Sequence, residues 1–126
     1  MPVLAVLRHE EGVRLDPDRL VALYSELGES GAERVIFRAM EELAARLSEM
    51  LKHADDGRAD RLIRSARLLA KVADQVGMAT LARVASDVVA SAETADGTAQ
   101  AATLARLIRI GERSLTAIWD LRDMTI

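Results

Sequence analysis

The sequence contains no cysteine, and only one tryptophan, one tyrosine and one phenylalanine among its 126 residues. Without cysteine, the chain can form no disulfide framework, no thiolate metal site and no cysteine nucleophile. Such a chain suits a reducing compartment, so we expect it in the cytoplasm. Because aromatic residues are so few, aliphatic side chains and alanine must fill the core, a composition that favours packed helices.

Long hydrophobic runs and an excess of basic charge are also missing. No apolar run approaches the roughly 20 residues that span a bilayer, and residues 1–7 are too short for a secretory signal, so we expect no membrane association. The net charge is −3 and the isoelectric point is near 5.4. We therefore expect no nucleic-acid partner, because nucleic-acid binding usually requires a basic balance and often stacking aromatics.

What is present is the composition of one globular domain. Half of the residues are apolar and 29% are charged, which excludes a disordered tail, and the length matches the commonest size of a single domain. Residues 1–15 show neither helical periodicity nor a hairpin partner, so this N-terminal arm stays unassigned as an arm, a short strand or an extra turn. The predicted domain is residues 16–126.

Helix boundaries are recognisable from Asp16 onward. Asp16 is a good N-cap, Pro17 fits the first helical position, and Gly28 ends this short first helix. A capping box at residues 30–33 then begins a long second helix, which the Asp-Asp-Gly cluster at 55–57 ends. The sequence thus predicts a short helix followed by a long amphipathic one.

Three further helices follow. They are predicted at about residues 58–76, ending at Gly77, at 78–92, and at 98–122. The fifth helix contains Gly111, which costs about 1 kcal/mol against alanine and either permits a close helix approach or is merely tolerated. The apolar positions predicted to be buried are Leu20, Leu23, Tyr24, Leu27, Ile36, Met40, Leu43, Leu47, Met50, Leu51, Leu62, Ile63, Ala66, Leu69, Ala70, Ala73, Val76, Leu81, Ala85, Val88, Val89, Ala101, Leu104, Ile108, Leu115, Ile118 and Trp119.

Helices of these lengths, joined by short loops, pack most simply as an antiparallel up-down four-helix bundle. The short first helix would then lie across one end of the bundle. No strand pattern competes with this interpretation. The expected fold class is therefore all-α.

Several strings along this helical order resemble the histidine-containing phosphotransfer (Hpt) domain of bacterial phosphorelays, over nearly the whole chain from residue 16. Residues 16–20 (DPDRL) resemble the opening of the family, and residues 27–30 (LGES) resemble its first turn. The most specific stretch is LIRSARLLAKVADQVGMATL at 62–81. The register of this resemblance is set by Gly77 and Leu81, together with the small residue Ala66.

In that register the residues that carry phosphate chemistry are lost. Arg67 occupies the position of the phospho-accepting histidine, Ala70 that of a lysine, and Lys71 that of a glycine. The chemistry requires a neutral imidazole nitrogen, which attacks an aspartyl phosphate and then holds a labile phosphoramidate. A guanidinium stays protonated and offers no lone pair. The resemblance therefore implies a degenerate member that carries no phosphate at the usual site.

The face that replaces the family's phosphorylation site should be exposed and basic. A helical projection places Arg64, Arg67 and Lys71 opposite the buried side, with Leu68 and Val72 beside them as a small apolar strip. A permanently cationic Arg67 could enter the acidic pocket of a receiver domain, the usual partner of this family, without exchanging phosphate. These five residues are the candidate docking surface.

Simpler interpretations of the same face stay open. Arg64, Arg67 and Lys71 could be a solvated surface on which Asp60 and Asp74 form helix-spaced pairs worth about 0.2–0.5 kcal/mol each. The apolar strip could also be covered by the N-terminal arm or by a second copy of the chain.

The two histidines offer little chemistry of their own. His53 falls at the predicted end of the second helix, where a histidine commonly interacts with the helix dipole or faces solvent, and His9 is interpreted as a surface residue. Neither histidine is spaced with carboxylates as a metal ligand, and no Ser/His/Asp set, glycine-rich phosphate loop or HExxH string occurs. We expect no enzyme activity, no cofactor and no metal. A phosphocarrier acting through His53 or His9 stays as an alternative, which predicts acid-labile phosphate on the protein.

Two hypotheses follow from the sequence. The first is a pseudo-phosphotransfer signalling protein that binds a response-regulator receiver domain or a histidine kinase. The second is a helical adaptor or homodimer unrelated to phosphorelay signalling.

Overall fold

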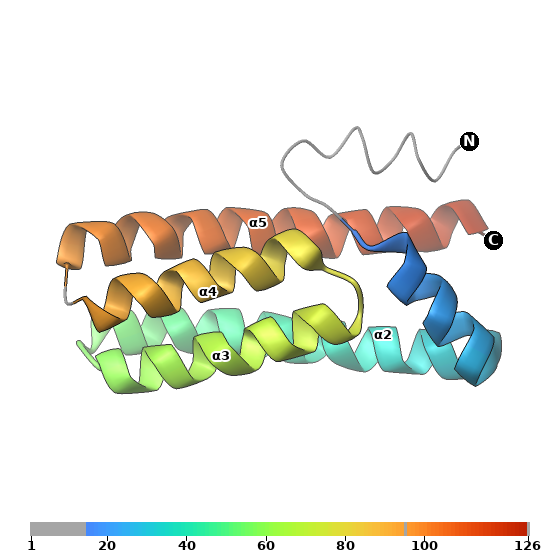
Figure 1. Cartoon of the computed structure of the whole chain (residues 1–126), viewed down its shortest axis with the longest axis horizontal. Coiled ribbons are helices and arrows are strands. Elements are labelled where there is room, and N and C mark those ends of the chain that lie inside the picture. The colour runs from blue at the N-terminus through green and yellow to red at the C-terminus, as the bar shows by residue number, and fades with distance from the viewer. Residues whose placement is uncertain (1–14, 95, 126) are drawn as a thin grey trace.

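The computed structural model describes residues 15–94 and 96–125, apart from the side chains of residues 119 and 121–125. In these ranges the chain is all-α and contains no strand, and its helices are α2 (Pro17–Asp55), α3 (Ala59–Gln75), α4 (Ala79–Glu93) and α5 (Gly97–Thr125). Figure 1 shows α3, α4, α5 and the longer part of α2 lying side by side, while the first turns of α2 cross one end. None of these four helices is long and apolar enough to cross a membrane.

The start of α2 follows from its capping residue. The Asp16 carboxylate accepts hydrogen bonds from the backbone N–H groups of Asp18 and Arg19, at 3.1 and 3.3 Å, and Pro17 occupies the first helical position. Gly28 interrupts the helical geometry with φ 74° and ψ 174°, values that glycine adopts easily. The predicted short first helix corresponds to the part of α2 that precedes this kink.

Glycines in the left-handed region follow α2 and α3, at the ends predicted from the sequence. Gly57 has φ 68° and Gly77 has φ 76°. The turn at Gly77 also fastens the start of α2, because the Asp16 N–H donates to the Gly77 carbonyl at 2.6 Å and Arg19 Nε donates to the Gln75 carbonyl at 2.9 Å. The end of α3 is thereby joined to the beginning of the domain.

The core lies between the four helices. On α3 and α4 the predicted buried positions are largely confirmed, with no exposed surface at Leu62, Ala66, Leu69, Ala73, Val76, Leu81, Ala85 and Val88. On α2 the prediction is wrong for Tyr24, Leu27 and Leu51, which are 37%, 47% and 45% exposed, and on α5 it is wrong for Ala101. The α5 residues that are buried include Leu107, Ile110 and Ser114. Leu104 and Ile118 are buried as predicted, and Ile108 and Leu115 pack against the core, so the sequence defined most of the buried side of α5.

Contacts at Leu47 and Leu15 show how α2 meets the rest of the core. A Cβ atom placed on Gly111 would lie 2.6 Å from Leu47 Cδ1, so this glycine permits a close approach of α5 to α2. Leu15, the last residue of the predicted N-terminal arm, is buried in the core. The rest of that arm, including His9, lies outside the described residues.

Candidate functional site

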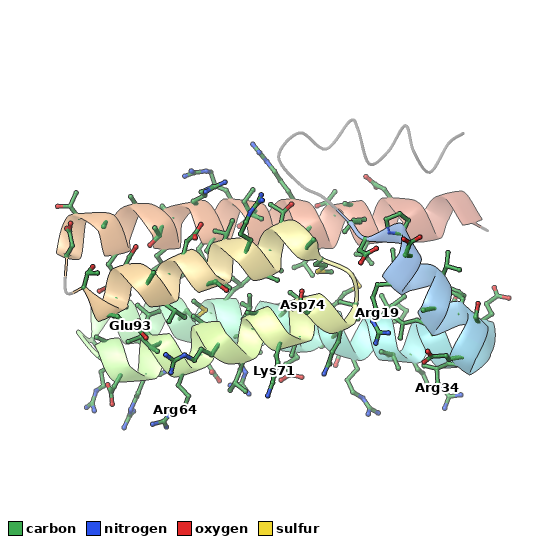
Figure 2. The ribbon with its side chains drawn as sticks, viewed as in Figure 1. Arg19, Arg34, Arg64, Lys71, Asp74 and Glu93 are labelled. Atoms are coloured by element: carbon green, nitrogen blue, oxygen red, sulfur yellow. The ribbon has the colours of Figure 1, made fainter. Side chains whose placement is uncertain are left out.

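The candidate site is the outward face of α3, which is separated from the core by the strong amphipathicity of this helix. Leu62, Ala66 and Leu69 are fully buried, whereas Arg64 and Lys71 are exposed. Figure 2 shows Arg64 and Lys71 extending from α3 away from the other helices. The structure therefore places these two predicted docking residues on one accessible surface.

Arg67 is exposed on the same helix, but it has a partner within the chain. One of its guanidinium nitrogens lies 2.7 Å from a carboxylate oxygen of Glu93, the last residue of α4. Side chains on a helix lean toward the N-terminus of that helix, so Arg67 reaches toward the end of α3 that lies beside the end of α4. The pair joins the α3 face to the last turn of α4, where Figure 2 labels Glu93.

The carboxylates of α3 itself do not neutralise this face. In the part of the chain that the structure describes, Asp60 and Asp74 form no ion pair with Arg64, Arg67 or Lys71. The predicted helix-spaced pairs are therefore absent. Of the three cations on this face, Arg67 is the one that has an ion-pair partner among the described residues.

The apolar strip beside the cations is smaller than predicted. Leu68 is 40% exposed and stands on the surface as expected. Val72 is half-buried and packs against the core, so it contributes less exposed surface to the strip than expected. The helical projection placed Val72 beside the basic residues, and the packing of the neighbouring helices left it partly covered.

The residues that set the register of the resemblance have structural roles. Ala66 and Leu81 are fully buried, and Gly77 has both a positive φ and Asp16 in close contact. Ala70 is half-buried against the core and offers no charge. Arg67 therefore stands exposed immediately after a small buried residue, ten residues before the glycine that ends the helix.

Neither a metal site nor a histidine adds a residue to this candidate site within the described part of the chain. His53 is half-buried in the last turn of α2, the position expected from the sequence. Within residues 15–94 and 96–125, no group of three or more histidine, aspartate or glutamate side chains could hold a metal ion.

Glu93 is the site residue that the sequence did not reveal. Asp87 stands as far after Gly77 as Arg67 stands before it, so simple counting along a helical hairpin would have paired these two. In the structure, a carboxylate oxygen of Asp87 instead lies 3.8 Å from a guanidinium nitrogen of Arg106 of α5, and Arg67 forms its ion pair with Glu93. The partner of Arg67 is determined by the register of α3 against α4 and by the directions in which the two side chains point.

Comparison with known proteins adds no relative. No protein-family model matches the chain, and no curated protein and no solved structure matches it.

Proposed function

We propose that this chain is a pseudo-phosphotransfer module of a bacterial two-component phosphorelay, which binds a receiver domain or a histidine kinase through the outward face of α3. The observation that carries this proposal is the exposed position of Arg67, between Arg64 and Lys71. The resemblance assigns this position to the family's phospho-histidine. Such a face suits an acidic surface on the partner, because an arginine donates charge-assisted hydrogen bonds to carboxylate or phosphoryl oxygens.

The proposed role is binding without phosphate transfer. Arg67 has no nucleophilic nitrogen, Ala70 offers no charge to stabilise a phosphoryl group, and Lys71 adds bulk where the family has glycine. The module would occupy the docking surface of a partner and leave the phosphate where it is. It is accordingly proposed as a non-enzymatic protein that needs no cofactor.

The proposal includes the finer description of the fold. The four helices would form an antiparallel up-down bundle, as in the family, with the segment before Gly28 across one end. The short turns at Gly57 and Gly77 and the arrangement in Figure 1 support this description. A cytoplasmic location belongs to the same proposal, since the chain has no cysteine.

The test is binding of the purified chain to a panel of receiver domains and kinases from the same genome, with each receiver measured in its phosphorylated and unphosphorylated states. We expect micromolar or tighter binding to a small subset, and at least a tenfold loss with Arg67→Glu, because the substitution places a carboxylate against an acidic surface. Arg109→Glu is the matched control: it makes the same change of charge at an exposed position of α5 and should bind normally. Equal losses in both variants, or no binding by any panel member, would contradict the proposal.

A second candidate function is self-association or adaptor binding through apolar surface. Val21, Tyr24 and Leu27 recur at three-residue spacing before the kink in α2, and all three are exposed in part. Light scattering discriminates this candidate, because a dimer would have twice the 13.7 kDa mass of one chain. A dimer broken by Val21→Ser, combined with no receiver binding, would favour this function over the first.

A further inference from the structure

Arg67 is the most important cation of the proposed docking face, and within the chain it is already paired with Glu93. Their charged atoms are 2.7 Å apart, while the two side chains are 63% and 51% exposed. An acidic partner that approaches α3 therefore meets an arginine whose charge is already neutralised, together with a carboxylate of its own sign. Among the described residues, no carboxylate pairs with Arg64 or Lys71.

We propose that Glu93 is an intramolecular competitor, which an acidic partner must displace from Arg67 before it docks on α3. The inference rests on the proposed function and adds a regulatory contact to it. In the free protein Glu93 screens Arg67 from weakly acidic surfaces. A partner pairs with Arg67 only if it presents an anionic group that binds the guanidinium more strongly than the Glu93 carboxylate does.

The geometry makes this displacement feasible. A solvent-exposed ion pair contributes little net stability and is screened by salt, so it can open without disturbing the fold. The recorded contact joins one guanidinium nitrogen to one carboxylate oxygen. A partner site that presents two oxygens in a fork, or a phosphoryl group, binds a guanidinium more strongly than this single contact does. The acidic pocket of a receiver domain has the chemistry to compete.

Glu93 contributes little to the helix that carries it. It is the last residue of α4, and a carboxylate there faces the negative end of the helix dipole. The last turn of α4 has no basic residue that would offset this repulsion. Glu93→Gln should therefore leave the fold intact, and the effect of the variant on binding can be interpreted as a change at the site.

Asp87 provides a matched control. It pairs with Arg106 at 3.8 Å, and these side chains are 49% and 51% exposed, close to the values of Arg67 and Glu93. Asp87→Asn raises the net charge by the same one unit as Glu93→Gln, but it leaves Arg67 unchanged. Comparing the two variants separates release of Arg67 from a general change in electrostatic attraction.

The experiment has two readouts. The first is the NMR signal of the Arg67 Nε–H group in the free protein, which should shift in Glu93→Gln and stay in place in Asp87→Asn. The second is the affinity of wild type and both variants for the receiver panel. We expect Glu93→Gln to tighten binding about two- to fivefold, or to reveal receivers that wild type does not retain, while Asp87→Asn changes affinity by less.

Each outcome separates the competitor from the docking function. An unchanged Arg67 signal in Glu93→Gln would show that the pair does not form in solution and would overturn the inference. Receiver binding that is equal in all three proteins, or equally tightened by both variants, would overturn the competitor while leaving the docking function intact. If neither wild type nor Glu93→Gln binds any receiver, the docking function fails, and the competitor fails with it.

Discussion

Gly77 combines a disfavoured backbone angle with a neighbour that leaves no room for a side chain. Its φ is 76°, and a Cβ atom at this position would lie 2.9 Å from the backbone oxygen of Asp16. That oxygen cannot easily withdraw, because the N–H of the same residue donates to the Gly77 carbonyl at 2.6 Å. Glycine is therefore required here for two independent reasons.

We expect Gly77→Ala to lower the free energy of unfolding by about 2–4 kcal/mol, the sum of left-handed backbone strain and a close contact. Gly57→Ala is the control, because Gly57 has a similar φ of 68° with open space around it. That variant should lose only about 1–2 kcal/mol. Urea denaturation of both variants measures the difference. Equal losses would show that the contact with Asp16 imposes no cost.

The candidate site shows how far single residues could be predicted. Arg64, Arg67, Leu68 and Lys71 stand on the surface as expected, because the hydrophobic pattern of α3 is strong enough to define its buried side. Glu93 was missed, because it is separated from Arg67 by 26 positions and joins it only through the packing of α4. Local periodicity gives no information on contacts of that kind.

At the scale of the elements, the approach of α5 to α2 depends on Gly111. An alanine Cβ there would lie 2.6 Å from Leu47 Cδ1, and Leu47 is buried, so its side chain has little space in which to turn away. Overpacking should cost more than the roughly 1 kcal/mol that alanine gains over glycine in a helix. Packing and helix propensity therefore act in opposite directions at this one position.

We expect Gly111→Ala to lower the free energy of unfolding by about 1 kcal/mol, the balance of these two effects. In a Leu47→Ala background the obstructing atoms are gone, so the same substitution should stabilise the protein by up to about 1 kcal/mol. A double-mutant cycle measured by thermal or urea unfolding gives the coupling between the two sites. Additive effects would show that α5 and α2 do not meet as closely as the structure indicates.

At the scale of the whole molecule, the described part of the chain has one core, to which all four helices contribute. Leu69 lies in it without exposed surface, whereas its neighbour Leu68, about 100° further round α3, is 40% exposed. The two residues have the same chemistry and lie on the same helix. Any difference between the stability losses of their alanine variants therefore reflects the different burial of the two side chains in the assembled helices.

Leu69→Ala should lower the free energy of unfolding by about 2–5 kcal/mol, because truncating a buried leucine leaves a cavity. Leu68→Ala should cost less than about 1 kcal/mol, since this side chain already faces solvent. Circular dichroism during urea unfolding should show one cooperative transition in both variants, as is usual for a single small domain. A similar loss in the two variants would contradict the orientation of α3.

The sequence by itself determined the fold class, the boundaries of most helices and the cationic face of α3. Capping residues, positive-φ glycines and apolar periodicity act over a few neighbouring residues, so they are visible without a structure. The tertiary structure alone decided the exposure of Leu51 and Ala101, the partial burial of Val72, the pairing of Arg67 with Glu93 and the contact of Asp16 with Gly77. Each of these depends on how helices distant in the chain pack together, which local patterns do not specify.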